Sequence, residues 1–134
     1  MRFSCLCLAA ALGLACGVET RELAGQLGPE DPVLTLEGSY YEAHEVALGP
    51  GWTLEATMRS TELDALLVLV DPEGALVAEA DGGAGGHDAR LRATVTTGGR
   101  YRVLATSFHA REEGAYALRI TTRAGPAEAP GAAR

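Results

Sequence analysis

Hydrophobic and polar residues alternate along much of the chain between residues 33 and 123. The pattern is clearest at 52–59, where Trp, Leu, Ala and Met take turns with Thr, Glu, Thr and Arg. The same period of two recurs at 100–105 and at 116–121. Successive side chains of a β-strand point to opposite faces, so these segments are predicted to be strands with one buried and one solvent-exposed face.

Ala65–Val70 is apolar at every position, which predicts a central strand covered on both faces. Periodicity alone leaves a buried helical turn open as the alternative. The run ends at Asp71-Pro72-Glu73-Gly74, a turn sequence in which Pro72 fixes its own φ and Gly74 accepts a positive φ.

Further turn sequences lie at 81–86, at 98–99 and at 112–114, and the 17 glycines and 5% aromatic residues fit a light aliphatic core with many turns. Short strands at regular spacing indicate an all-β fold, a small antiparallel β-sandwich of jelly-roll-like type with seven to eight strands. The strands are predicted at Tyr40–Leu48, Gly51–Ser60, Ala65–Val70, Ala75–Ala80, Arg90–Thr96, Arg100–Phe108 and Ala115–Thr122, with Val33–Glu37 as a candidate eighth.

The two flanks of this region are predicted to lie outside the sandwich. Residues 16–32 contain several glycines and prolines, which favours a flexible tether, with a short helix at Glu19 to Leu27 as the alternative. Residues 124–134 contain only Ala, Gly, Pro, Glu and Arg, which predicts a disordered tail. The predicted domain therefore covers 33–123.

The first 15 residues have the pattern of a signal peptide. Arg2 precedes an apolar run from Phe3 to Ala15, too short to span a bilayer as a helix. All three cysteines lie within the first 16 residues, so no disulfide framework is expected in the predicted domain.

The segment Leu12–Gly17 resembles the lipobox of bacterial lipoproteins, which implies lipidation of Cys16 and an anchor in the cell envelope. Gly13 and Leu14 depart from the family's usual leucine and small residue. Gly13-Leu14-Ala15 also fits an ordinary signal peptidase, and this alternative predicts secretion. Loss of residues 1–15 removes Arg2 and leaves 10 arginines against 18 acidic residues, a formal charge of −8.

Every basic residue of the chain is an arginine, and the arginines are spread along the sequence. On strands they are expected to be solvent-facing groups that aid solubility. Because a phosphate-binding surface needs clustered positive charge, no nucleic-acid partner is expected.

Several short motifs together resemble the bacterial pre-peptidase C-terminal domain, a β-sandwich found appended to secreted proteases and other exported proteins. The resemblance spans about Val33 to Arg123 and implies a non-catalytic accessory module. It rests on Gly38-Ser39-Tyr40-Tyr41, Leu69-Val70-Asp71-Pro72-Glu73-Gly74, the glycine-rich turn from Asp81, Asp88-Ala89-Arg90-Leu91, Gly99-Arg100-Tyr101-Arg102-Val103 and Gly114-Ala115-Tyr116-Ala117-Leu118.

Some domains of this family bind calcium, which makes Asp81, Asp88 and Asp71 the candidate ligands. Aspartates flanking a glycine-rich loop supply the oxygen ligands that a hard cation takes. The chain departs from the commoner family pattern, since Ala80 replaces the first of two adjacent acidic residues. A loop without a ligand is the alternative.

No catalytic set is apparent. His44-Glu45 lacks the second histidine of the zinc-protease motif, because Leu48 occupies that position. Ser107 and His109 are expected on one strand face, but neither a nucleophile elbow nor an orienting acid is evident.

The sequence thus favours a non-catalytic, envelope-anchored binding or scaffolding module that engages a protein or a glycan. The alternative is a secreted, calcium-dependent carbohydrate-binding module that stacks sugars on exposed aromatic residues. The candidates for such stacking are Tyr40, Tyr41 and Trp52, whose other expected use is core packing.

Overall fold

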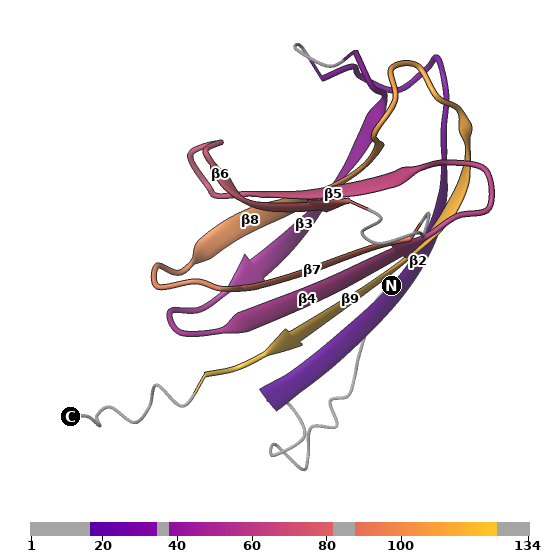
Figure 1. The fold of residues 1–134 in the computed structure, drawn as a ribbon. Helices are drawn as coiled ribbons and strands as arrows, with labels where there is room; N and C mark the ends of the chain where they lie inside the picture. Colours follow the sequence, from indigo (N-terminus) through magenta and orange to yellow (C-terminus); the bar gives the residue numbers. More distant parts are fainter. Residues whose placement is uncertain (1–16, 35–37, 82–87, 126–134) are drawn as a thin grey trace.

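The protein is a sandwich of two four-stranded antiparallel sheets, with no helical element in residues 17–34, 38–81 and 88–125, the part that the computed structural model describes (Figure 1). All-β architecture is therefore confirmed. The strands are β2 (Val18–Leu27), β3 (Tyr41–Leu48), β4 (Thr53–Arg59), β5 (Ala65–Val70), β6 (Leu76–Asp81), β7 (Ala89–Thr94), β8 (Gly99–Ser107) and β9 (Gly114–Arg123).

The strand order is that of a jelly roll. One sheet has the order β2-β9-β4-β7 and the other β3-β8-β5-β6, so nearly every connection passes from one sheet to the other. The seven predicted strands are all present, with ends within two residues of those expected. Gly74 has a φ of 87°, as its turn requires.

The eighth strand is not the expected one. Val33 forms only an isolated bridge with Tyr40, and 35–37 lie outside the described residues. Instead Val18–Leu27, predicted as a tether or a helix, forms β2 and pairs with β9 over all ten of its residues. Because Leu27 is fully buried and Leu23 packs against the core, β2 is an integral edge strand of the sandwich.

The hydrophobic core lies between the sheets and draws on all eight strands, with Ala78 and Ala80 of β6 at its margin. The apolar strand β5 also has a second covered face. Leu66 and Val70, on its outer side, are nearly buried together with Leu104 of the neighbouring β8. The prediction of a central strand covered on both faces is confirmed.

The connections divide between the two ends of the sandwich (Figure 1). The short turns β3–β4, β5–β6 and β7–β8 lie at one end, together with the two ends of the described chain, where Val18 faces Arg123. We call this the base. The connections β2–β3, β4–β5 and β8–β9 lie at the other end, together with the end of β6 and the start of β7, and we call this the loop end.

Among the described residues no helix is long and apolar enough to cross a membrane. The predicted signal peptide, Cys16 and nearly all of the predicted tail lie outside the described residues.

Candidate functional site

The β8–β9 loop, Phe108–Glu113, is held in place by neighbouring loops. Its backbone donates hydrogen bonds from Phe108 N to Asp64 O, at 2.8 Å, and from Arg111 N to Gly38 O, at 3.1 Å. Arg111 has a φ of 58°, a left-handed conformation rarely adopted by a residue with a side chain. The loop is thus fixed both by the β4–β5 loop and by the β2–β3 connection.

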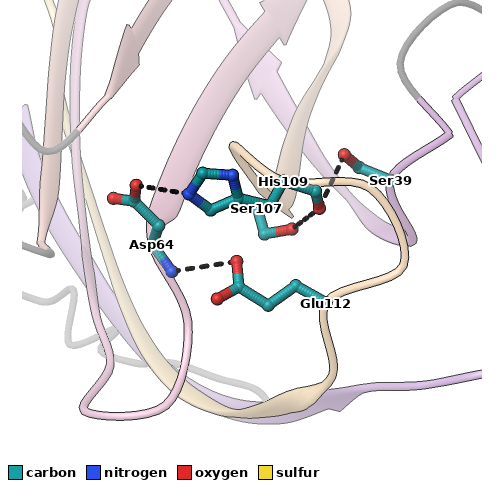
Figure 2. Close-up of polar contacts among 5 residues, drawn as sticks. All are labelled: Ser39, Asp64, Ser107, His109 and Glu112. Carbon is teal, nitrogen blue, oxygen red and sulfur yellow. Dashed lines mark hydrogen bonds and ion pairs between the residues drawn. The ribbon is translucent and has the colours of Figure 1, made fainter.

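Two buried hydroxyls hold the centre of the loop (Figure 2). Ser107 Oγ and Ser39 Oγ both donate to the backbone carbonyl of His109, at 2.7 and 3.2 Å. Neither serine is exposed to solvent. A carbonyl oxygen with two lone pairs is fully satisfied by two donors, so this arrangement fixes the loop at little cost.

The β4–β5 loop supplies the lateral contacts of the site (Figure 2). Asp64 Oδ2 lies 3.3 Å from His109 Nε2, and Asp64 N donates to Glu112 Oε1 at 3.2 Å. The sequence does not predict Asp64 as a partner of His109, because the two residues belong to different connections. The jelly-roll order brings those connections to one end.

These residues do not form a hydrolytic triad. His109 has a carboxylate neighbour in Asp64, but the Ser107 hydroxyl donates to a backbone carbonyl and is enclosed by protein. A serine nucleophile must instead be hydrogen-bonded to the imidazole and accessible to substrate.

The loop exposes the side chains of Phe108 and His109 to solvent. Phe108 is 55% exposed, and its ring meets that of His109 edge to face, with centroids 5.4 Å apart. The His109 side chain is 62% exposed. An aromatic ring displayed on an immobilised loop is suited to binding, since little conformational entropy is lost when a partner covers it.

The aromatic residues predicted to face a ligand do not form a common platform. Tyr40 is buried in the core, Tyr41 is half-buried at the loop end, and Trp52 packs against the core at the base. The prediction is wrong for Tyr40, because the alternation in β3 points it between the sheets. Phe108, which the sequence predicts at the end of a strand, lies instead just beyond β8 with its aromatic side chain exposed.

The three candidate calcium ligands are not brought together. Asp81 lies beside Leu66 at the loop end of β5, whereas Asp71 follows Val70 at the base, roughly 15 Å away along the strand. Asp71 Oδ1 accepts hydrogen bonds from Glu73 N and Ala75 N and so stabilises its own turn. The expected set of three is therefore wrong in including Asp71.

Asp88 also lies at the loop end, where Oδ1 accepts a hydrogen bond from Ser60 N at 3.2 Å. Residues 82–87 of the glycine-rich loop are outside the described residues, and the described ones contain no cluster of three metal-ligating side chains. Calcium binding by Asp81 and Asp88 stays a prediction.

A second polar group lies between the sheets. Glu42 and His44 of β3 point inward to Tyr116 of β9, which donates to Glu42 Oε1 and lies 3.0 Å from His44 Nε2. Burial, and secondly the charge of Arg21, lower the pKa of His44 below its ordinary 6.5. Burial and the Glu42 carboxylate raise the pKa of the Tyr116 phenol. We assign this group to the structure of the sandwich, because Tyr116 is almost fully buried.

Comparison with known proteins relates the chain to others by fold. No family model matches it, and no curated protein matches it by sequence. Membership of the pre-peptidase C-terminal family therefore stays a prediction. Among solved structures the chain is similar to Aeromonas hydrophila PliG, a periplasmic lysozyme inhibitor of g-type lysozyme. The TM-score is 0.61 at 11% identity, over 92% of this chain and 93% of PliG, which shows a shared fold.

Proposed function

We propose that the protein is an exported, non-catalytic binding module that holds a protein partner with the loop end of its sandwich. The observation that carries the proposal is the β8–β9 loop, whose backbone is tied to two neighbouring connections and to Ser107 at the end of β8, while Phe108 stays exposed. Aromatic anchors that enter a pocket of the partner supply much of the binding free energy in many protein interfaces.

The similarity to PliG supports this proposal and suggests a first partner to test. PliG is described as a periplasmic inhibitor of a g-type lysozyme, hence as an exported protein that binds an enzyme. A lysozyme of this class is therefore the first partner to test, with other envelope proteins as the wider class.

The position of the chain ends fits an anchored module. Gly17, the residue after the proposed lipidation site Cys16, lies at the base, where its carbonyl accepts a hydrogen bond from Ala124 N at 2.7 Å. An anchor at Cys16 would place the loop end on the side of the molecule that faces away from the membrane.

Phe108→Ala tests the proposal, with Leu76→Ala as the matched control. Leu76 is a similarly exposed apolar residue, 62% exposed, but it lies at the base. In calorimetric titration of the full chain with a g-type lysozyme, F108A is expected to weaken binding by roughly 2 kcal/mol, about thirty-fold. L76A is expected to bind within two-fold of the unaltered protein.

Absence of lysozyme binding would reject that partner and leave the wider class to be tested. The same three proteins, bound to resin, then capture partners from an envelope extract of the source cells. The proposal requires a discrete protein that is retained by the unaltered chain and L76A and lost with F108A. Equal retention by all three, or recovery of polysaccharide alone, would contradict it.

A further inference from the structure

The outer face of the β2-β9-β4-β7 sheet gathers arginines that are far apart in the sequence. Alternation along these strands points five arginines outward but only two glutamates, Glu22 and Glu55. The arginines are Arg59 of β4, Arg90 and Arg92 of β7, and Arg119 and Arg123 of β9. Their side chains face solvent, as the sequence predicts, and the strand order brings them onto one face although they are spread along the sequence. We call this surface the arginine face.

The charge of the arginine face is opposite to that of the rest of the protein. Five arginines and two glutamates give it a formal charge of +3. The remaining 6 arginines and 16 acidic residues of the chain sum to −10. Such segregation creates a local positive potential, which attracts anionic ligands to this face in spite of the net negative charge.

A shallow hollow marks the centre of the face. The strand register places Glu22, Arg119, Thr57 and Arg90 side by side across the four strands. Together with Arg59 these residues line a hollow of about 170 Å³. Pockets for drug-sized ligands are larger, about 300–1,000 Å³, so the hollow suits a single charged group.

Two of the arginines at the hollow are available to a ligand. Arg119 pairs with Glu22 at 2.8 Å, and Arg92 lies 3.5 Å from Glu55. Arg59 and Arg90 have no ion-pair partner within the described part of the chain. Guanidinium groups bind carboxylate, sulfate and phosphate oxygens through paired hydrogen bonds.

The composition of the face indicates which kind of partner fits it. In the strands as the structure describes them, the outward side chains of this face include no aromatic ring. A base or a neutral sugar would therefore have no ring on which to stack. The large apolar side chain of the arginine face is Val18, which lies at the margin. Surfaces that insert into membranes, and the hot spots of protein interfaces, use several large apolar side chains. The arginine face, which is four strands wide, would therefore recognise a ligand through charge alone.

We propose that the arginine face binds an anionic polysaccharide, with one acidic group of the polymer seated between Arg59 and Arg90 and neighbouring groups on the other arginines. This site lies on the outer face of the sheet, includes no residue of the β8–β9 loop, and does not depend on the protein partner proposed above.

Affinity electrophoresis of the full chain, purified in detergent, tests the proposal. The gels contain polygalacturonate, dextran sulfate or uncharged dextran. We expect retardation by at least one of the two polyanions, none by uncharged dextran, and loss of the effect at about 0.5 M salt, where exposed charges are strongly screened.

The double variant R59Q/R90Q is expected to bind the polyanion at least ten-fold more weakly. The control R100Q/R102Q changes the net charge equally, but on β8 of the other sheet, and is expected to bind like the unaltered protein. Thr57→Glu, which places a carboxylate at the hollow, provides a second variant with the same expected loss.

Three results would overturn the proposal: no retardation by either polyanion, equal weakening by R59Q/R90Q and R100Q/R102Q, or unchanged binding by T57E. A fourth is stronger binding to phosphatidylglycerol vesicles or to polyglutamate than to the polysaccharides, which would assign the face to a membrane or to an acidic protein segment.

Discussion

His44 illustrates how a single partly buried residue links the stability of this sandwich to pH. The Tyr116 phenol donates its hydrogen to Glu42, so the hydrogen shared with His44 comes from His44 Nε2. The neutral ring makes this bond. A second proton would add a charge in a partly buried position near Arg21, which is why the pKa of His44 is lowered.

We therefore expect the free energy of unfolding to fall as the pH drops below 6.5. In that range the unfolded chain binds a proton at residue 44 that the folded protein does not, until the pH reaches the lowered folded pKa. Urea unfolding between pH 8 and pH 5 measures this loss. His44→Gln, which retains an N–H donor, should remove this part of the pH dependence, whereas the exposed His109→Gln should retain it. An equal slope in H44Q and the unaltered protein would contradict the assignment.

The positions of Ser107 and of the residues in the β8–β9 loop could be predicted from the sequence only in part. Ser107 continues the inward alternation of Val103 and Ala105, so its burial follows from period two. The strand ends at Ser107, however, and His109 lies in a turn where that period no longer holds. The shared face predicted for Ser107 and His109 failed for this reason, and the contact between Asp64 and His109 required the topology.

Among the elements, β2 is the one that sequence patterns concealed. Its ten residues contain Gly25 and are followed by Gly28 and Pro29, which are ordinary signals of a loop. An edge strand buries little of its surface, so its hydrophobic alternation is weak. Gly25 has a packing reason instead, because the Tyr116 ring of the adjacent β9 lies against it.

Gly25→Ala is accordingly expected to destabilise the protein by about 1–3 kcal/mol, as overpacking of a filled site does. The new Cβ would lie 2.5 Å from the Tyr116 hydroxyl oxygen and 2.6 Å from Glu42 Oε1. Gly28→Ala is the control, because a Cβ there meets no atom within 4 Å. Urea unfolding of both variants provides the measurement. If G25A were as stable as G28A, β2 would not pack against the Tyr116 group.

The other seven strands were predictable because each carries enough alternation, or in β5 enough continuous hydrophobicity, to be recognised locally. Their partners were not. The pairing of β4 with β9, for example, joins segments more than fifty residues apart, and it is this pairing that builds the arginine face. Sequence thus predicted the class of the fold and the exposure of the arginines, whereas their proximity depends on strand order.

At the scale of the whole molecule, the strand found in place of the predicted tether affects how an anchored protein would be oriented on a membrane. Because β2 begins at Val18, only Gly17 separates the proposed lipidation site Cys16 from the sandwich. The base would then lie against the lipid headgroups. Strands of up to ten residues, at about 3.3 Å per residue, would hold the loop end roughly 30 Å above them.

Fluorescent labels at the two ends can measure this arrangement. The full chain is processed in cells and reconstituted in vesicles that contain a quencher lipid. One variant carries the label at Thr97→Cys in the base, and the other carries it at His109→Cys in the loop end. Lipidation of Cys16 blocks its thiol, so we expect one label per variant, strongly quenched at 97 and little at 109. Vesicle binding that is lost with Cys16→Ser would link the orientation to the lipid. If the unaltered chain did not bind the vesicles, or if Cys16 itself were labelled, the result would favour ordinary signal cleavage and a secreted protein. Equal quenching at both positions would mean that the sandwich lies flat on the membrane.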